Sequence, residues 1–203
     1  EYGFISTGNL NEKTAQLYGD HCLLTANENI MADINKIFRY LENPALRLPV
    51  LKSCKTLLVS PVSMRKQVIQ LINKEIQFAK KKKPASITLK LNSLSDELMI
   101  EKLYDAAKVG VEINLIVRGI FCMLTENKQF KNIEAISIVD EYLEHARVMI
   151  FNNNGQEKVF ISSADWMTRN IDHRIEAACP IYSLELIEEL KNILKIQGSD
   201  NIK

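Results

Sequence analysis

Phe160-Ile161-Ser162-Ser163-Ala164-Asp165 is the stretch that decides the fold, because Phe4-Ile5-Ser6-Thr7-Gly8-Asn9 carries the same pattern 156 residues earlier. Each copy is an apolar run that ends in small residues and an amide or an acid. The same spacing relates Asp20 to Glu176. A pattern that recurs at one fixed spacing indicates an internal repeat, so we expect two related catalytic halves that face each other.

Length and composition are typical of a soluble globular protein and exclude fibrous and disordered chains. The 203 residues are 46% hydrophobic and 25% charged. The 26 Lys and Arg residues nearly balance the 25 Asp and Glu residues. Because the overall field is weak, any attraction for a polyanion must come from local placement of cations.

The four cysteines indicate reduced thiols in a cytosolic protein. They lie far apart and form neither a C-x-x-C zinc pair nor a dense disulfide framework. No run approaches the roughly 20 apolar residues that a membrane-spanning helix needs. These patterns leave an ordinary globular domain as the expected product.

Short β-branched runs alternate with helical patterns, which is typical of an α/β layer architecture. Asn27 and Ser63 are the expected N-caps of the first two helices. We expect helices at residues 28–40, 64–80, 98–108 and 184–194. We expect strands at residues 2–6, 22–25, 56–59, 87–91, 113–117, 135–139, 147–151, 159–161 and 174–178.

Two prolines, Pro44 and Pro49, mark the expected domain boundary because proline interrupts helices. Residues 1–50 would be the C-terminal tail of a first catalytic domain, truncated in this chain. Residues 51–203 would form a complete second domain. The tail is expected to pack poorly alone, because its sheet partners would lie before Glu1.

His145 is the strongest catalytic candidate among three histidines, since it precedes the second copy of the repeat. Alternation along a strand would place Arg147 on the same face as His145. An imidazole can act as nucleophile or general acid near neutral pH, and a guanidinium can hold phosphate oxygens. For a lone histidine, a purely structural role is the alternative.

A carboxylate can fix the tautomer of an active histidine. We expect Glu176 to orient His145, and Asp20 to have the same role for a first-half histidine upstream of Glu1. The other two histidines, His21 and His173, are interpreted as structural or exposed.

Arg118 is the second candidate ligand for an anion. It ends the apolar run 113–117 and is followed by Gly119. In open α/β sheets ligands gather beyond the carboxyl ends of strands, and a glycine there lets the backbone approach a phosphate. The lysine run 80–83, by contrast, is interpreted as a solvated helix end.

Three segments of the chain resemble the C-terminal half of the bacterial polyphosphate kinase family. They lie at residues 6–15, 136–147 and 162–172 and include Ser-Thr-Gly-Asn, Glu-His-Ala-Arg and Ser-Ser-Ala-Asp-Trp. The resemblance implies a phospholipase-D-like mixed sheet flanked by helices. One complete domain would follow the tail of a similar domain.

The resemblance also implies an activity and its site residues. The activity is reversible, ATP-dependent synthesis of polyphosphate through a phosphohistidine, with Mg²⁺ required. The nucleophilic histidine and the Mg²⁺ ligands would lie upstream, so no metal ligand is expected in this chain. Tyr18, Arg118 and His145 match the family's nucleotide and phosphate contacts. The expected supporting residues are Arg147, Glu176, Asp20, Asn9 and Ser163.

The expected partners are ATP, ADP, polyphosphate and the upstream domains of the same polypeptide, in a homo-oligomer and without nucleic acid. The expected location is the cytoplasm, free or peripheral at the inner membrane. Two other functions stay open at this stage. One is a phospholipase-D-type phosphodiesterase, and the other is a noncatalytic polyanion-binding module. Without the upstream histidine, this chain alone is expected to be inactive.

Overall fold

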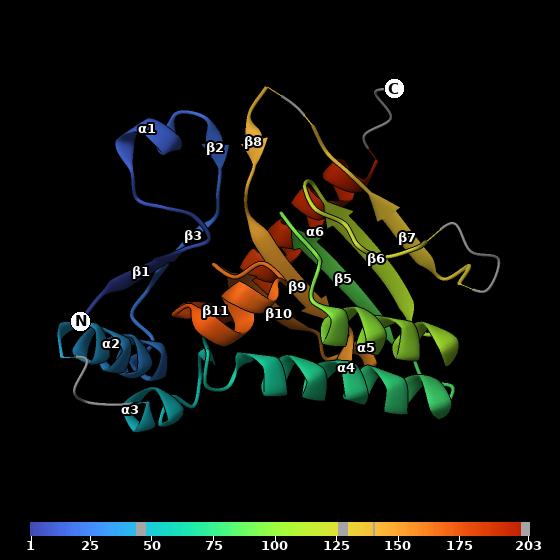
Figure 1. Ribbon diagram of the computed structural model, residues 1–203, viewed down its shortest axis with the longest axis horizontal. Helices are drawn as coiled ribbons and strands as arrows, with labels where there is room; N and C mark the ends of the chain where they lie inside the picture. Colours follow the sequence, from blue (N-terminus) through green and yellow to red (C-terminus); the bar gives the residue numbers. More distant parts are fainter. Residues whose placement is uncertain (44–47, 126–129, 140, 200–203) are drawn as a thin grey trace.

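The computed structural model describes residues 1–43, 48–125, 130–139 and 141–199 (Figure 1). Within them a seven-stranded mixed sheet forms the centre of the molecule. Its strands, in spatial order, are β4 (Leu58–Ser60), β11 (Glu176–Ile181), β10 (Lys158–Ser162), β9 (Arg147–Phe151), β5 (Ser86–Leu91), β6 (Glu112–Val117) and β7 (Ile133–Ile136). Neighbours from β4 to β5 are antiparallel, and β5, β6 and β7 are parallel. The predicted mixed α/β sheet is confirmed.

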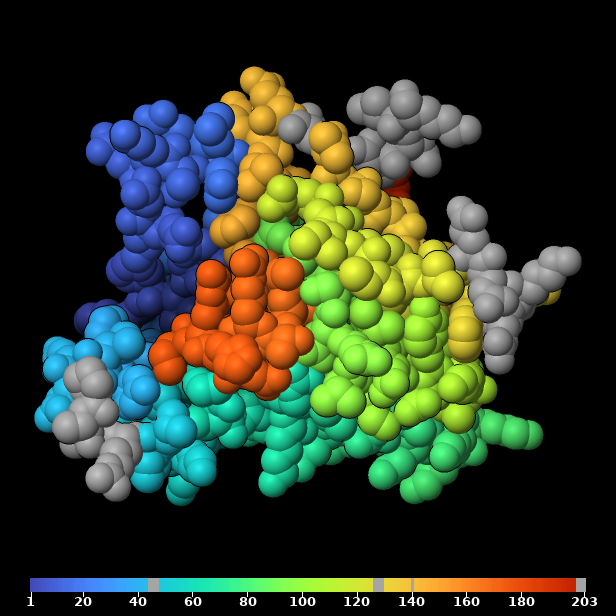
Figure 2. Space-filling view, viewed as in Figure 1, coloured from blue at the N-terminus to red at the C-terminus, as the bar shows by residue number. Residues whose placement is uncertain are grey.

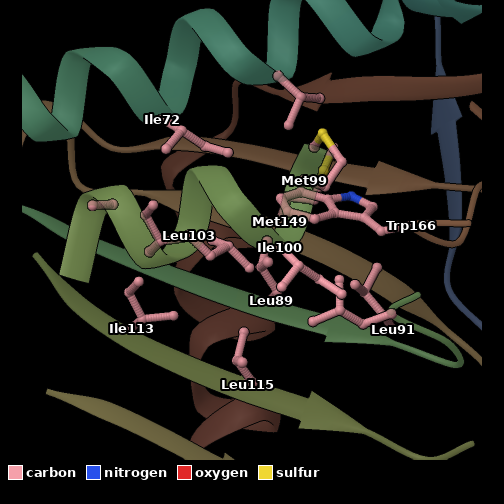
Figure 3. Packing of buried hydrophobic residues seen from close by; sticks show 14 of the residues in the cluster. Ile72, Leu89, Leu91, Met99, Ile100, Leu103, Ile113, Leu115, Met149 and Trp166 are labelled. Carbon is pink, nitrogen blue, oxygen red and sulfur yellow. The ribbon is translucent and has the colours of Figure 1, made fainter. Parts of the chain in front are cut away.

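Helices cover both faces of this sheet (Figure 1). Helices α4 (Met64–Lys80) and α5 (Glu97–Lys108) pack on one face, over a core that includes Trp166, Met99 and Leu89 (Figure 3). Helix α6 (Leu184–Gly198) covers the other face. Every second residue of a strand points to the same face, so the central strands supply apolar side chains to both cores.

The repeat extends well beyond the quoted motif. Strand β1 (Gly3–Ser6) pairs antiparallel with β3 (Cys22–Thr25), and α2 (Glu28–Glu42) follows. The succession β10, β11, α6 has the same order and the same antiparallel pairing. Helices α2 and α6 are each 15 residues long and begin 156 residues apart. The internal repeat is therefore a structural repeat.

Each of these helices is also capped in the same way. The side chain of Asn27 accepts backbone N–H groups of α2, and Ser183, 156 residues later, accepts one from α6. Ser63 occupies the N-cap position of α4 as expected, but its hydroxyl bonds back to the main chain of Val59 and makes no cap hydrogen bond. A serine that bonds backwards is not available to the first turn of its helix.

The first repeat copy forms an arm that reaches the second. Helix α1 (Glu12–Ala15) leads to β2 (Tyr18–Gly19), which pairs parallel with β8 (Leu143–Glu144). The carbonyl of Gly19 accepts the backbone N–H groups of His145 and Ala146, both at 3.0 Å. Figure 2 shows this arm in blue, standing beside the gold β8 segment. The arm thus holds the chain around His145.

Helix α2 anchors the N-terminal part against the main domain. The carboxylate of Asp33 is 2% exposed and accepts the backbone N–H groups of Lys55, Thr56 and Leu57 at 2.7–3.0 Å. The β1–β3 ribbon, in contrast, exposes Phe4 and other apolar side chains. The expectation that this tail packs poorly on its own stays a prediction.

Most predicted elements are confirmed, with small shifts of their ends. The short β2–β8 pair, α1 and α3 (Pro49–Lys52) were not predicted, because two to four residues carry no recognisable period. Residues 44–47 of the predicted boundary lie outside the described residues. Within the part that the structure describes, no helix is long and apolar enough to cross a membrane.

Candidate active site

The turn of the first repeat copy is built by Thr7. Its backbone N–H donates to the carbonyl of His21 at 3.0 Å, and its hydroxyl oxygen accepts the N–H of His21 at 3.0 Å. The same hydroxyl donates to Asp20 Oδ1 at 2.6 Å. Thr7 thereby locks the loop that carries Asp20.

The turn of the second copy repeats these bonds around Ser163. Its N–H donates to the carbonyl of Ala177 at 3.1 Å, and its hydroxyl oxygen accepts the N–H of Ala177 at 3.2 Å. The hydroxyl also donates to a carboxylate oxygen of Glu176. The two copies therefore share one hydrogen-bonding plan, in which each hydroxyl fixes one carboxylate.

His145 lies at the junction of the two copies, between β8 and β9. Its Nδ1 is 3.0 Å from Asp20 Oδ2 and 3.1 Å from Oδ1. The ring of Tyr18 packs beside it, with 4.8 Å between ring centroids. None of the described residues forms a hydrogen bond with Nε2 of His145. The carboxylate orients the ring, and Nε2 is the nitrogen available to a ligand.

The charge of Asp20 is stabilised by this contact. Burial by itself would raise the pKa of the Asp20 carboxyl, because it disfavours the charged form. The hydrogen bonds from His145 and Thr7 outweigh burial and hold this pKa below its ordinary value. Asp20 is therefore an ionised partner for His145 at neutral pH.

The prediction that Glu176 orients His145 is wrong. Glu176 accepts hydrogen bonds from Ser163 and from Nδ2 of Asn170, the latter at 2.9 Å. The arm instead carries Asp20 across to His145. Each carboxylate was assigned to the histidine of its own repeat copy, whereas the fold pairs the first-copy carboxylate with the second-copy histidine.

Arg147 lies next to His145 as predicted, with 3.4 Å from its Nη1 to Nδ1 of His145. Its other contacts point inward. It is 8% exposed, pairs with Asp165 at 3.1 Å and donates from Nη1 to the carbonyl of Thr7 at 2.9 Å. This geometry contradicts the expected phosphate contact, because the guanidinium braces the two repeat turns against each other.

Arg118 follows β6 and is half-buried. Its Nε and Nη2 donate to Oδ1 of Asn92 at 2.9 and 2.7 Å. In the part of the chain that the structure describes, Nη1 has no hydrogen-bond partner. The guanidinium is thus fixed on one side and free on the other, which suits an anion ligand.

Two buried polar residues at the end of β5 were missed by sequence reasoning. Asn92 donates from Nδ2 to the carbonyl of His145 at 3.0 Å. Lys90 is 1% exposed, donates to the carbonyl of Ala146 at 3.2 Å and pairs with Glu144 at 3.0 Å. One signal was available for Asn92, because it ends the strand adjacent to the one that Arg118 ends.

Asn9 is exposed and is not brought to His145. Its counterpart 156 residues later, Asp165, is buried and accepts the backbone N–H groups of Asn92 and Ser93 at 2.8 and 3.1 Å. Among the described residues, no three His, Cys, Asp or Glu side chains gather as a metal site. The site thus brings together one oriented imidazole, that of His145, and one guanidinium with a free edge, that of Arg118.

Comparison with known proteins assigns the chain to a family. The family model "Polyphosphate kinase C-terminal domain 2" matches residues 57–203, and "Polyphosphate kinase C-terminal domain 1" matches residues 1–47. The chain belongs to the polyphosphate kinase family. It is 47% identical to polyphosphate kinase of Escherichia coli K12 and 47% identical to that of Vibrio cholerae, over its whole length in both cases. It spans 29% and 28% of those relatives.

Solved structures agree with this assignment. Polyphosphate kinase from Porphyromonas gingivalis superimposes on the whole chain with a TM-score of 0.93 and 45% identity, over 31% of its own length. Nuc from Salmonella typhimurium, a phospholipase D family member, covers 68% of this chain with a TM-score of 0.51 and 18% identity. At that identity the likeness concerns the fold alone, and the predicted phospholipase-D-like fold is confirmed.

Proposed function

We propose that this chain is the C-terminal catalytic part of a polyphosphate kinase that transfers the terminal phosphate of ATP reversibly to inorganic polyphosphate. The proposal is carried by His145, a histidine held by a carboxylate on Nδ1 and open at Nε2, in a member of this family. ATP, ADP, polyphosphate and the upstream domains are the proposed partners. A homo-oligomer in the cytoplasm is the proposed state.

The proposed reaction has two transfer steps. A histidine nitrogen upstream of this chain bonds to the γ-phosphorus of ATP while the bond from that phosphorus to the bridging oxygen of ADP breaks. A terminal oxygen of polyphosphate then bonds to the phosphorus, and the phosphorus–nitrogen bond breaks. Both steps depend mainly on positioning and charge neutralisation.

His145 and Arg118 are the proposed contributions of this chain. Through Nε2, His145 gives a hydrogen bond or a proton to the phosphate undergoing transfer, while Asp20 stabilises the charged imidazole. Arg118 uses its free Nη1 edge for phosphate oxygens. The ring of Tyr18 packs beside that of His145, and Tyr18 is a proposed nucleotide contact.

Mg²⁺ is part of the proposal but not of this site. The cation would neutralise phosphate charge during transfer. As the family resemblance implies, its ligands are proposed to lie upstream of this chain. No step assigned to His145 or Arg118 depends on it.

The internal repeat suggests a role for Glu176, because Glu176 corresponds to Asp20. Asp20 of the first copy serves the histidine of the second copy, and Glu176 is held by Ser163 as Asp20 is held by Thr7. By the same relationship, Glu176 is the proposed partner of the upstream nucleophilic histidine.

The experiment uses the natural protein that carries this sequence, with Mg²⁺ and ATP labelled on its γ-phosphate. We expect long-chain polyphosphate and an acid-labile, base-stable phosphoprotein. His145→Ala should lower synthesis by about 10²-fold or more, a typical effect for general acid–base catalysis. His173→Ala, at an exposed histidine, is the matched control and should leave the rate unchanged. Near-normal synthesis by His145→Ala would contradict the assignment.

A further inference from the structure

Asn92 connects Arg118 with the main chain of His145. It is 5% exposed and follows β5 directly. Its backbone N–H donates to Asp165 Oδ1 at 2.8 Å, and its carbonyl accepts the N–H of Gly119 at 2.7 Å. Its side chain accepts from Arg118 and donates to the carbonyl of His145. The side chain of Asn92 therefore bonds to Arg118 and to the main chain of His145, and its backbone bonds to residues next to them.

The carboxamide suits this position chemically. Its oxygen accepts from a cation, its nitrogen donates to a carbonyl, and it carries no charge. An aspartate of the same shape would lose the donor and would pair with Arg118 as an ion. That pair would neutralise the guanidinium that is available to phosphate. The amide holds Arg118 in place while leaving its charge for a ligand.

The surrounding backbone also keeps Asn92 fixed. A Cβ atom at Gly119 would lie 2.8 Å from the carbonyl oxygen of Asn92, so the close approach of the two main chains requires glycine. Two residues earlier on the same face of β5, Lys90 holds the next carbonyl along, that of Ala146. The side chains of Asn92 and Lys90 therefore hold two consecutive carbonyls of the main chain, those of His145 and Ala146.

We infer that Asn92 is a positioning residue that sets the Arg118 guanidinium at a fixed place relative to His145, so that a phosphate chain bound by one is presented to the other. The inference rests on the proposed function and deepens it. In this role Asn92 acts through Arg118 and His145 rather than by contact with the nucleotide or the phosphate. Since a misplacement of about 1 Å can lower a rate by roughly 10²-fold, loss of the Asn92 contacts is expected to lower the rate of phosphate transfer.

The test uses the natural protein with Asn92→Ala, Asn92→Asp and Arg118→Ala, singly and with the two alanine changes combined. The probe is inorganic tripolyphosphate, whose Kd is measured by calorimetry, and kcat and KM for ATP are measured in parallel. The matched control is Asn132→Asp. Asn132 also donates to two backbone carbonyls, those of Ala107 and Val111, but at the far end of the sheet.

For Asn92→Asp we expect the Kd of tripolyphosphate and the KM for ATP to rise about 10-fold or more, as for loss of a charge-assisted contact. We expect kcat to fall as well. Asn92→Ala should weaken binding in the wild-type background and change Kd less than about twofold once Arg118 is alanine, because coupled residues are not additive. Asn132→Asp should match the wild type in Kd and kcat.

Three results would overturn the inference. One is a Kd for Asn92→Asp equal to that of the wild type, and another is an Asn92→Ala effect of the same size with and without Arg118. The third is no tripolyphosphate binding by the wild type. Failure of the proposed function would give a different result: the wild type would bind tripolyphosphate but make no polymer from ATP. The Kd values of Asn92→Ala, Arg118→Ala and the double variant would still decide the role of Asn92.

Discussion

The carboxylate of Asp20 lies 3.0 Å from Nδ1 of His145, although the two residues are 125 positions apart and belong to opposite copies of the repeat. This pair shows that the site is assembled across the duplication rather than within one copy. Three variants test this crossing, and a fourth tests how α2 is anchored to the main domain.

Asp20→Asn should keep the shape of the contact and remove its charge. We expect kcat for polyphosphate synthesis to fall by roughly 10²–10⁴, as when the carboxylate partner of a catalytic histidine is neutralised. KM for ATP should change little, because Asp20 faces the side of His145 away from Nε2. Asp105→Asn, on the exposed face of α5, is the control. A loss of less than about twofold in Asp20→Asn would mean that the carboxylate does not serve the reaction.

Glu176→Gln should act on the other half of the site. We expect less phosphohistidine on the upstream residue after a short pulse with labelled ATP, by about 10-fold or more. The imidazole of His145 should keep its nitrogen-15 chemical shifts, since Asp20 still holds it. A changed His145 spectrum with normal phosphohistidine formation would restore the same-copy pairing that the structure contradicts.

Gly8→Ala tests whether the Asp20 carboxylate must keep its position to serve His145. A Cβ atom at Gly8 would lie 1.8 Å from Asp20 Oδ2, so the carboxylate must move. We expect kcat to fall roughly 10-fold with little change in melting temperature, because the displaced group is one side chain. Gly198→Ala is the control, since a Cβ atom there meets nothing within 4 Å. Equal rates for the two variants would show that Asp20 adapts without cost.

Asp33→Ala should destabilise the junction between α2 and the main domain. Three backbone N–H groups lose their acceptor, and the free energy of unfolding should fall by about 2–4 kcal/mol in urea titrations at pH 7. Asp105→Ala removes an exposed ion-paired carboxylate and should change it by less than about 0.5 kcal/mol. Similar values for the two variants would mean that α2 is not anchored through Asp33.

The same variant has a defined pH dependence. Burial would raise the pKa of Asp33, but Lys36 and the N–H groups of Thr56 and Leu57 outweigh it and lower this pKa. A lowered folded-state pKa stabilises the protein fully above the unfolded-state value of about 3.9. That stabilisation is lost as pH falls through the folded-state pKa. The difference between wild type and Asp33→Ala should therefore shrink in acid, and a constant difference from pH 7 to pH 2 would contradict it.

Much of the fold could be predicted from the sequence because its signals are long or repeated. The periodic runs of α2, α4, α5 and α6 and the β-branched strands gave the layer architecture. The repeat spacing gave the duplication. The β2–β8 pair could not be predicted, since two residues on each strand carry no pattern and their pairing depends on the arm.

Some residues of the site were predictable from the sequence, but their pairings were not. His145 and Arg118 have sequence signals, whereas the exchange of carboxylates between copies depends on how the arm folds over. Arg147 was assigned to phosphate because a strand face does not reveal which neighbour, here Asp165, already occupies a guanidinium. Lys90 carries no sequence signal. Asn92 has one, its position directly after the strand beside the one that Arg118 follows, but only the buried contacts show what the two residues hold.

Carrying both repeat copies on one polypeptide has a further consequence for how the site can evolve. A symmetric homodimer must place identical residues on both sides of its axis. Here one side has Gly8 and Asp20, and the other has Ala164 and Glu176 at the same places. Each side can therefore be altered by mutation without altering its counterpart. Under the proposed function, this freedom would let the upstream histidine act as the phosphoryl carrier and His145 as the donor of a proton or hydrogen bond.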